Sequence, residues 1–200
     1  TILPSELAQF FDTEMEKVFL HKYVTHCLQT FDYQSRLLNP ARSLHTRPAQ
    51  LRGPIIVCVD TSGSMQGEPY SIALSLMMRL SEGCGKERRR CYLVAFSVQA
   101  TPIDVLQDRT KLLDFFTRHP TGDTDARRML ATIFALLHEN PLYAGADVLW
   151  VTDFRIPLPL KNDLYQMQEI RKRGTRFYGL QIGIAENRWL PYFDEMYQIS

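Results

Sequence analysis

The sequence lacks the features that mark membrane-spanning, disulfide-stabilised and strongly charged proteins. No apolar run approaches the roughly 18 residues of a spanning helix, and no signal-peptide core is present. The 4 cysteines form no C-x-x-C pair, which argues against zinc or a disulfide framework and favours a reducing, cytoplasmic setting. The 23 basic and 22 acidic residues give a net charge of +1, so charge alone predicts neither a nucleic-acid nor a membrane partner.

The 200 residues fit one domain with a short appendage. Apolar residues recur at three- and four-residue steps over residues 5–35, which predicts an N-terminal helical arm. Residues 39–53 contain prolines and arginines without periodicity, a pattern typical of a linker. We therefore predict a helical arm and linker over residues 1–50 and the main domain over residues 51–200.

Beyond the linker, apolar runs alternate with helical patterns. The apolar runs are at 54–60, 91–96, 147–153 and 176–182, with an alternating edge-strand pattern at 101–106. The helical patterns are at 68–82, 109–118, 125–139 and 162–173, and Trp189 and Tyr192 are expected in a short closing helix that packs on the sheet. Strands that are apolar on both faces are typical of parallel sheets covered by helices on both sides. The main domain is therefore predicted to be an α/β protein, a Rossmann-like sandwich with a mostly parallel central sheet.

Two of the predicted strands end in a carboxylate, at Asp60 and Asp153. In open α/β sheets, ligands bind in the crevice at the carboxyl ends of the strands. The candidate site is therefore expected at this edge of the sheet, where both carboxylates would lie.

Hydroxyl side chains gather at the same edge. Ser62 and Ser64 occupy alternate positions of a tight turn after the first strand, and Gly63 permits its sharp backbone. Thr124 stands just before a later helix. A hard cation such as Mg²⁺ takes oxygen ligands and keeps several waters. Serine and threonine hydroxyls, with waters held by two aspartates, would meet that requirement.

The pattern Asp60-x-Ser62-x-Ser64 resembles the metal-ion-dependent adhesion site of von Willebrand factor A (VWA) domains. That family adds a threonine from a later loop and an aspartate at the end of a further strand, and Thr124 and Asp153 are the counterparts here. The resemblance implies direct coordination by Ser62, Ser64 and Thr124. It implies that Asp60 and Asp153 act mainly through water. Mg²⁺ is the expected cation, and Mn²⁺ or Ca²⁺ remain alternatives because oxygen ligands accept all three.

The likeness extends to the C-terminal part of bacterial ViaA-type proteins. It is carried by the segments Arg52-Gly53-Pro54, 55–65, Arg89-Arg90-Cys91-Tyr92 and Thr152-Asp153-Phe154. The resemblance implies a partner ATPase of the MoxR class of AAA+ proteins, with this domain as an adaptor between the ATPase and its clients. An acidic residue of a partner would complete the coordination of the cation.

One residue departs from the VWA pattern. Asp123 stands immediately before Thr124, where VWA domains usually have a glycine, and we expect its side chain to face solvent.

Two other functions stay open alternatives. A metal-dependent phosphoester hydrolase could use the same site, but Ser62 stands where haloacid-dehalogenase-type phosphatases have their second aspartate. A nucleic-acid-binding module could use the basic cluster at 86–90, although no aromatic platform accompanies it. Residues 154–160 are either part of a partner-facing rim or a stiff loop. We expect metal-dependent protein recognition, no catalysis and no nucleic-acid partner.

Overall fold

The computed structural model describes residues 53–199, together with Gln9, Met15, Val18, Phe19, Lys22 and the backbone of Arg36–Leu37. The helical arm predicted for residues 1–50 thus lies almost wholly outside the described residues. Phe19 is fully buried in the apolar core on one face of the sheet. The division into an arm and a main domain stays a prediction.

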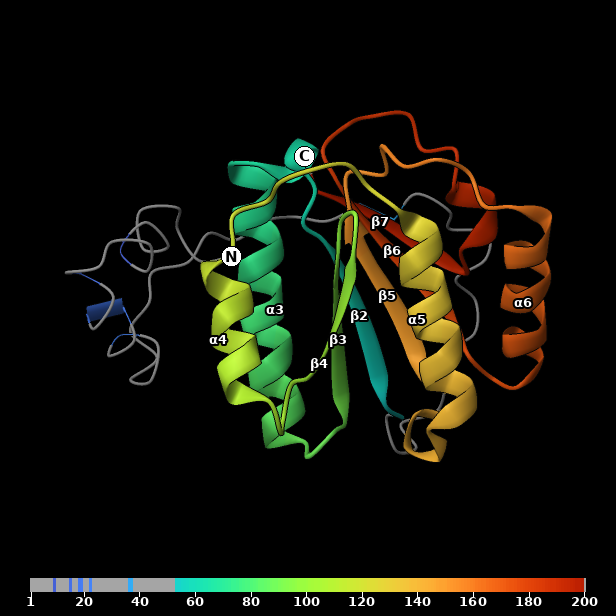
Figure 1. Ribbon diagram of the computed structural model, residues 1–200, viewed down its shortest axis with the longest axis horizontal. Coiled ribbons are helices and arrows are strands. Elements are labelled where there is room, and N and C mark those ends of the chain that lie inside the picture. The colour runs from blue at the N-terminus through green and yellow to red at the C-terminus, as the bar shows by residue number, and fades with distance from the viewer. Residues whose placement is uncertain are drawn as a thin grey trace.

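A seven-stranded sheet in the order β1-β7-β6-β5-β2-β3-β4 forms the centre of the molecule (Figure 1). Its strands are β1 (Arg36–Leu37), β2 (Ile55–Asp60), β3 (Cys91–Phe96), β4 (Ala100–Asp104), β5 (Asp147–Thr152), β6 (Phe177–Ile182) and β7 (Glu195–Ile199). Strands β2, β3, β5, β6 and β7 run parallel to one another, whereas β1 and β4 pair antiparallel at the two edges. The predicted mostly parallel sheet is confirmed.

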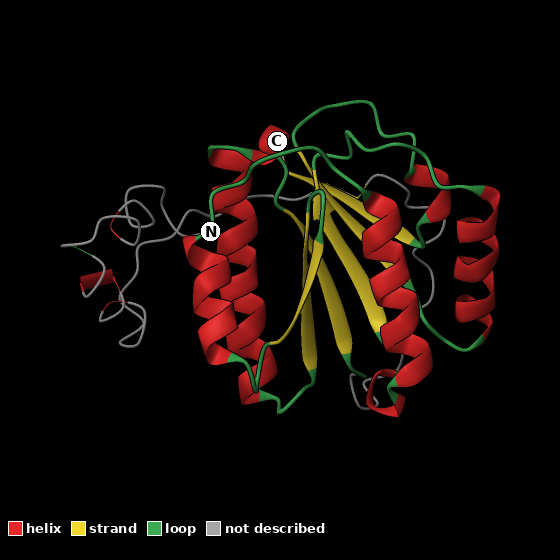
Figure 2. Ribbon diagram, in the orientation of Figure 1, coloured by secondary structure: helices red, strands yellow, loops and turns green. Residues whose placement is uncertain are grey.

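Helices cover both faces of the sheet (Figure 2). On one face lie α3 (Glu68–Lys86) and α4 (Arg109–Thr117), and on the other lie α5 (Ala126–Glu139) and α6 (Lys161–Lys172). Single 3-10 turns occur at Gly63–Met65, Pro141–Tyr143 and Leu190–Tyr192. In the described part of the chain, no helix has the length and apolar character needed to cross a bilayer. The sandwich predicted from the sequence is confirmed.

Strand β2 shows why the sequence folds in this way. Its side chains alternate between the two faces of the sheet. Ile55, Val57 and Val59 join the core beneath α3 and α4. Ile56 and Cys58 join the core beneath α5 and α6. Because both faces are buried, the strand needs apolar residues at every position before Asp60, and this produced the continuous run seen in the sequence.

The end of the chain differs from the prediction. A short closing helix was expected around Trp189 and Tyr192, but the structure has one 3-10 turn at Leu190–Tyr192 followed by strand β7. Only Met196 of β7 is buried, and the other residues of that strand are partly exposed. The strand was missed because such a sequence has no continuous apolar run.

The topology determines where a ligand site should lie. The chain passes from β2 to β3 on one side and later crosses to β5 on the other side, so the strand order reverses between β2 and β5. Asp60 ends β2, and Asp153 directly follows its parallel neighbour β5. Both carboxylates therefore stand at the switch point of the sheet, where ligands bind in folds of this kind.

Candidate metal centre

The carboxylate of Asp60 is buried and fixed between two strand ends. Its Oδ1 accepts a hydrogen bond from the backbone N–H of Ser62, at 2.9 Å, and its Oδ2 accepts one from Thr152 Oγ1, at 2.6 Å. Burial raises the pKa of Asp60. These hydrogen bonds oppose that effect, and repulsion from Asp153 adds to it, with a net result above the ordinary value. Asp60 is thus a rigid, desolvated carboxylate.

The turn after Asp60 brings two hydroxyls together. Met65 is fully buried and donates its backbone N–H to Ser62 O at 3.1 Å, which anchors the 3-10 turn. Ser62 Oγ and Ser64 Oγ lie 3.2 Å apart. Adjacent oxygens around an octahedral cation lie about 2.9 Å apart for Mg²⁺ and about 3.4 Å for Ca²⁺, because the metal–oxygen distances are about 2.05 and 2.4 Å. The spacing of the two hydroxyls fits neighbouring ligands of one such ion.

The loop that carries Thr124 is bonded to this turn. The N–H of Gly63 donates to Gly122 O at 2.9 Å, and the N–H of Thr121 donates to Thr61 O at 2.9 Å. Gly122 has φ +79°, and a Cβ atom there would lie 3.3 Å from Val98. The positive φ makes this position strained for any residue other than glycine, and the close approach of Val98 adds to the preference.

The third loop begins with Asp153, whose side chain is almost fully buried. Its Oδ1 accepts a hydrogen bond from the backbone N–H of Arg155 at 3.0 Å, and the Arg155 Nε lies 3.6 Å from Oδ2. The side chain of Arg155 is 69% exposed. The carboxylate is therefore partly neutralised by a cation that can swing away into solvent.

Between these two residues, Phe154 turns the chain away from the sheet. Its φ is +58°, which is unusual for an aromatic residue. Its N–H donates to Thr152 Oγ1 at 3.1 Å, and its ring packs edge-on against Phe193 at 5.5 Å between centroids. A positive φ at such a residue costs of order 1–3 kcal/mol, and the hydrogen bond and ring packing offset this cost. The conformation of Phe154 sets the direction in which the loop leaves β5.

Hydrogen bonds connect three of the five predicted ligands: Asp60 accepts from the N–H of Ser62, and the hydroxyls of Ser62 and Ser64 are bonded to each other. Asp153 is close enough for its charge to raise the pKa of Asp60. Thr124 is connected through its loop alone, and its side chain lines an adjacent groove. The role of all five as cation ligands stays a prediction.

Two further residues contact the predicted ligands and were given no role from the sequence. Thr152 links the ends of β2 and β5 through Asp60, and Arg155 covers Asp153. Both lie within two residues of Asp153, which the sequence did single out, and this proximity was the one available sign that they contact the site. Among the described residues, no group of three or more His, Cys, Asp or Glu side chains could hold a metal. The predicted set contains only two carboxylates and otherwise hydroxyls.

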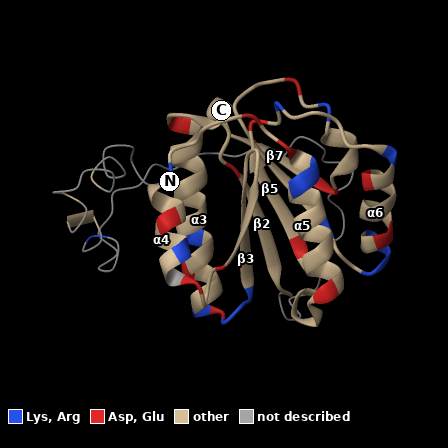
Figure 3. Ribbon diagram, viewed as in Figure 1, with Lys and Arg blue, Asp and Glu red and all other residues tan. Residues whose placement is uncertain are grey.

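The basic cluster at 86–90 lies between α3 and β3, at the opposite end of the sheet from Asp60 (Figure 3). Arg89 in this cluster has an ion pair with Asp147, at 3.7 Å from Nη2 to Oδ2. Arg88 has φ +50° in the connecting turn. One of these cations therefore has a structural role at the base of β5.

Comparisons with known proteins agree on the kind of domain. Residues 20–193 match the sequence model of a family described as VWA domain containing CoxE-like protein. The regulatory protein ViaA of Edwardsiella ictaluri is 29% identical over 178 residues, which cover 84% of this chain and 37% of that protein. The regulatory protein ViaA of Proteus mirabilis is 29% identical over 194 residues, which cover 90% of this chain and 39% of that protein. The chain therefore spans under two fifths of the length of these curated relatives.

The fold also has a counterpart among solved structures. The pilus adhesin SpaC from Lactobacillus rhamnosus GG, in its open conformation, matches with a TM-score of 0.50. The match has 14% identity and covers 70% of this chain and 25% of that one. At this level of identity the likeness concerns the fold alone.

Proposed function

The chain belongs to the family of VWA domain-containing CoxE-like proteins, and from that premise we propose that it is a regulatory protein-interaction domain of the ViaA type and not an enzyme. The ViaA relatives are named as regulatory proteins, which supports the first part of the proposal. The second part is supported by Ser62, which replaces the second carboxylate that a phosphatase would use at this position.

In this proposal the domain recognises its partner through a divalent cation, with Mg²⁺ as the first choice. The hydroxyls of Ser62, Ser64 and Thr124 would hold the ion directly. The carboxylates of Asp60 and Asp153 would hold its water ligands. The observation that carries the proposal is the 3.2 Å spacing of the two serine hydroxyls above a buried, hydrogen-bonded Asp60 at the switch point of the sheet.

The chemistry of these ligands explains why such a site would bind an acidic group. Neutral hydroxyls and waters leave most of the charge of a cation unquenched. A carboxylate of a partner protein would complete the coordination. Unit charges about 4 Å apart attract by about 4 kcal/mol at an effective dielectric constant near 20, before desolvation is subtracted. The contact would be reversible and dependent on the cation.

The partner in this proposal is a MoxR-class AAA+ ATPase or one of its clients, and the setting is cytoplasmic. The likeness to regulatory ViaA proteins over 84% and 90% of the chain supports a protein partner, and the MoxR class is what the resemblance to ViaA-type proteins implies. The basic cluster is not used in this proposal, because Arg89 is bound to Asp147 far from the candidate centre.

The test is the affinity between this chain and the MoxR-class ATPase of its own organism, measured by biolayer interferometry with Mg²⁺ and with EDTA. EDTA, and the double variant Ser62→Ala/Ser64→Ala, should each weaken binding at least about tenfold, which is about 1.4 kcal/mol. The control is Ser71→Ala/Ser81→Ala, which removes two α3 hydroxyls that donate to the backbone carbonyls of Gly67 and Met78. Equal affinity with and without the cation would refute the proposal.

A further inference from the structure

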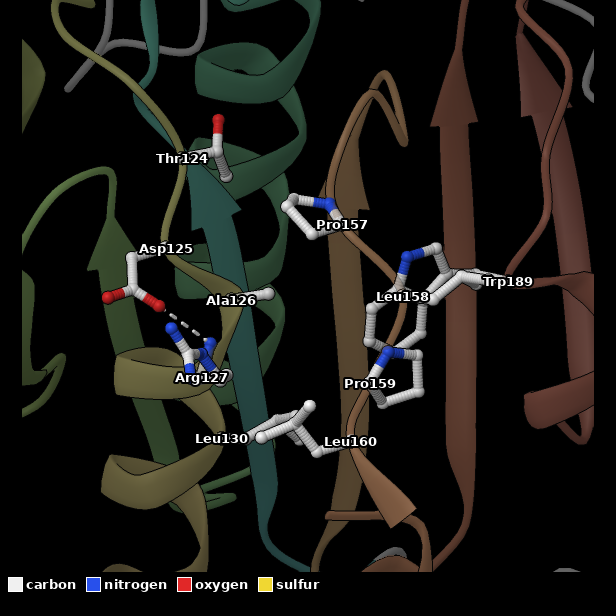
Figure 4. Close-up of a pocket in the computed structure, with 10 residues that line it drawn as sticks. All are labelled: Thr124, Asp125, Ala126, Arg127, Leu130, Pro157, Leu158, Pro159, Leu160 and Trp189. Carbon is white, nitrogen blue, oxygen red and sulfur yellow. Dashed lines mark hydrogen bonds between the residues drawn. The ribbon is translucent and has the colours of Figure 1, made fainter. Parts of the chain in front are cut away.

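A groove of about 340 Å³ lies beside the candidate metal centre (Figure 4). One wall is the start of α5 and the other is the segment between β5 and α6. The lining residues are Thr124, Asp125, Ala126, Arg127, Leu130, Pro157, Leu158, Pro159, Leu160 and Trp189. The groove is therefore largely apolar, with one end at a predicted cation ligand.

The second wall is preformed. Trp189 is fully buried, and its Nε1 donates to Ile156 O at 3.3 Å, which ties the segment to the core. The N–H of Leu160 donates to Asp163 Oδ2 at 3.0 Å, where α6 begins. Between these anchors, two prolines restrict the backbone. Leu158 and Leu160 are held on this wall with exposed fractions of 37% and 53%.

The groove is continuous with the candidate centre through Thr124. Figure 4 shows Thr124 and Pro157 at one end of the groove and Leu130 and Leu160 at the other end. The loop that carries Thr124 is hydrogen-bonded to the turn that carries Ser62 and Ser64, through the N–H of Gly63 and the carbonyl of Gly122. A peptide that reached a cation held by this turn would therefore pass the mouth of the groove.

The charge at the groove favours an acidic segment. The Asp125 carboxylate caps α5 by accepting the N–H groups of Arg127 and Arg128, and it pairs with the Arg128 guanidinium at 3.4 Å. Its charge is thus largely used within the helix end. Arg127 is exposed and contributes the only basic side chain among the lining residues. A partner segment with carboxylates complements this rim.

We propose that the groove takes a bulky apolar side chain, leucine or phenylalanine, from a partner peptide whose nearby acidic residue occupies the metal centre. The inference rests on the proposed function. It adds an apolar groove that would distinguish acidic partners carrying a nearby leucine or phenylalanine from those that lack one. The volume is near the lower end of the range of about 300–1,000 Å³ for small-molecule sites. It therefore suits one or two side chains better than a large cofactor.

The test uses fluorescein-labelled Gly/Ser peptides and fluorescence anisotropy with the whole chain. One peptide set carries a single Asp, one carries a single Leu, and one carries both at varied spacings. With Mg²⁺ present, the best peptide with both residues should bind about tenfold tighter than the Asp peptide, as expected from burial of one leucine side chain. Leu160→Ser should remove this advantage. Leu142→Ser, at a leucine of matching 52% exposure outside the groove, should leave it intact.

The possible failures are distinct. If the Asp and Asp–Leu peptides bind equally and both need Mg²⁺, the groove inference is wrong while the proposed function stands. If no peptide responds to Mg²⁺, the proposed function is wrong. If the Leu peptide binds as tightly as the Asp–Leu peptide, the groove serves another apolar ligand and the inference is overturned. Absence of any binding overturns both.

Discussion

At the scale of single residues, the buried carboxylate of Asp60 opposes stability, and in the proposed site it would serve cation binding. Burial raises its pKa, so the ionised form destabilises the folded protein when no cation is bound. Asp60→Asn removes the charge and keeps the size of the side chain, with its amide oxygen accepting from Ser62 N–H and its amide N–H₂ donating to Thr152 Oγ1. We expect its unfolding midpoint at pH 7, without divalent cations, to rise by about 2–4 °C, which is about 1 kcal/mol. We also expect the stabilisation by Mg²⁺ to disappear, and differential scanning fluorimetry measures both effects.

The pH dependence of this difference follows from the direction of the pKa shift. Below the unfolded-state pKa of about 3.9, Asp60 is protonated in both states and imposes no penalty. Above its raised folded-state pKa, the full penalty is present. The stability gain of Asp60→Asn should therefore shrink as the pH falls from 7 towards 4. A gain that grew in acid would contradict this account of Asp60.

Arg155 offers a second prediction at this scale. Its guanidinium lies 3.6 Å from Asp153 and competes with any cation for that carboxylate. Because the Arg155 side chain is mostly exposed, the competition is weak, at about 0.2–1 kcal/mol. Arg155→Gln should therefore tighten Mg²⁺ binding by about 1.4- to fivefold in isothermal titration calorimetry. Lys172→Gln, which breaks an exposed pair with Glu169 on α6, is the control. Weaker binding by Arg155→Gln would contradict the competition.

The site residues differ in how far the sequence predicts them. Asp60 and Asp153 could be found because each follows an apolar run, and the position of a strand end is visible in the sequence. Thr152 could not be assigned its role. Its bond to Asp60 depends on the pairing of β2 with β5, and strands separated by almost 90 residues give no local sign of that pairing.

At the scale of secondary-structure elements, strand β6 supports the loop that carries Asp153. A Cβ atom at Gly179 would overlap Met196 and lie 3.1 Å from the Phe154 ring. Gly179→Ala should therefore lower the free energy of unfolding by about 1–3 kcal/mol, measured by urea denaturation. It should also weaken Mg²⁺ binding, because Phe154 adjoins Asp153.

The control for this prediction is Gly83→Ala in α3, where a Cβ atom would meet nothing within 4 Å. That change should stabilise the protein by about 0.5–1 kcal/mol, because alanine favours the helix. If Gly179→Ala were as stable as the wild type, the close packing of β6 against Phe154 would be wrong.

The elements themselves were predictable to the extent that they are buried on both faces. Strand β3 (Cys91–Phe96) has the bounds expected from its apolar run. Strand β7 (Glu195–Ile199) was missed, because it lies near the sheet edge and buries one residue. Hydrophobic periodicity reports burial, so an element with little burial leaves little signal.

At the scale of the whole molecule, the candidate centre exists because three distant loops meet at one edge of the sheet. The loops after β2 and β5 meet because those strands are parallel neighbours. The loop before α5 joins them through its bonds to Thr61 and Gly63. The sequence predicted this meeting only through the fold class, since an alternating α/β pattern places all carboxyl ends of parallel strands at one edge.

The central claim is that these loops share one cation, and anomalous diffraction from crystals of the chain soaked in Mn²⁺ tests it most directly. The account predicts one strong peak within about 2.6 Å of both Ser62 Oγ and Ser64 Oγ, with Thr124 as a further ligand, and no such peak in Ser62→Ala/Ser64→Ala. A Mn²⁺ peak only elsewhere on the molecule, or none at all, would contradict it.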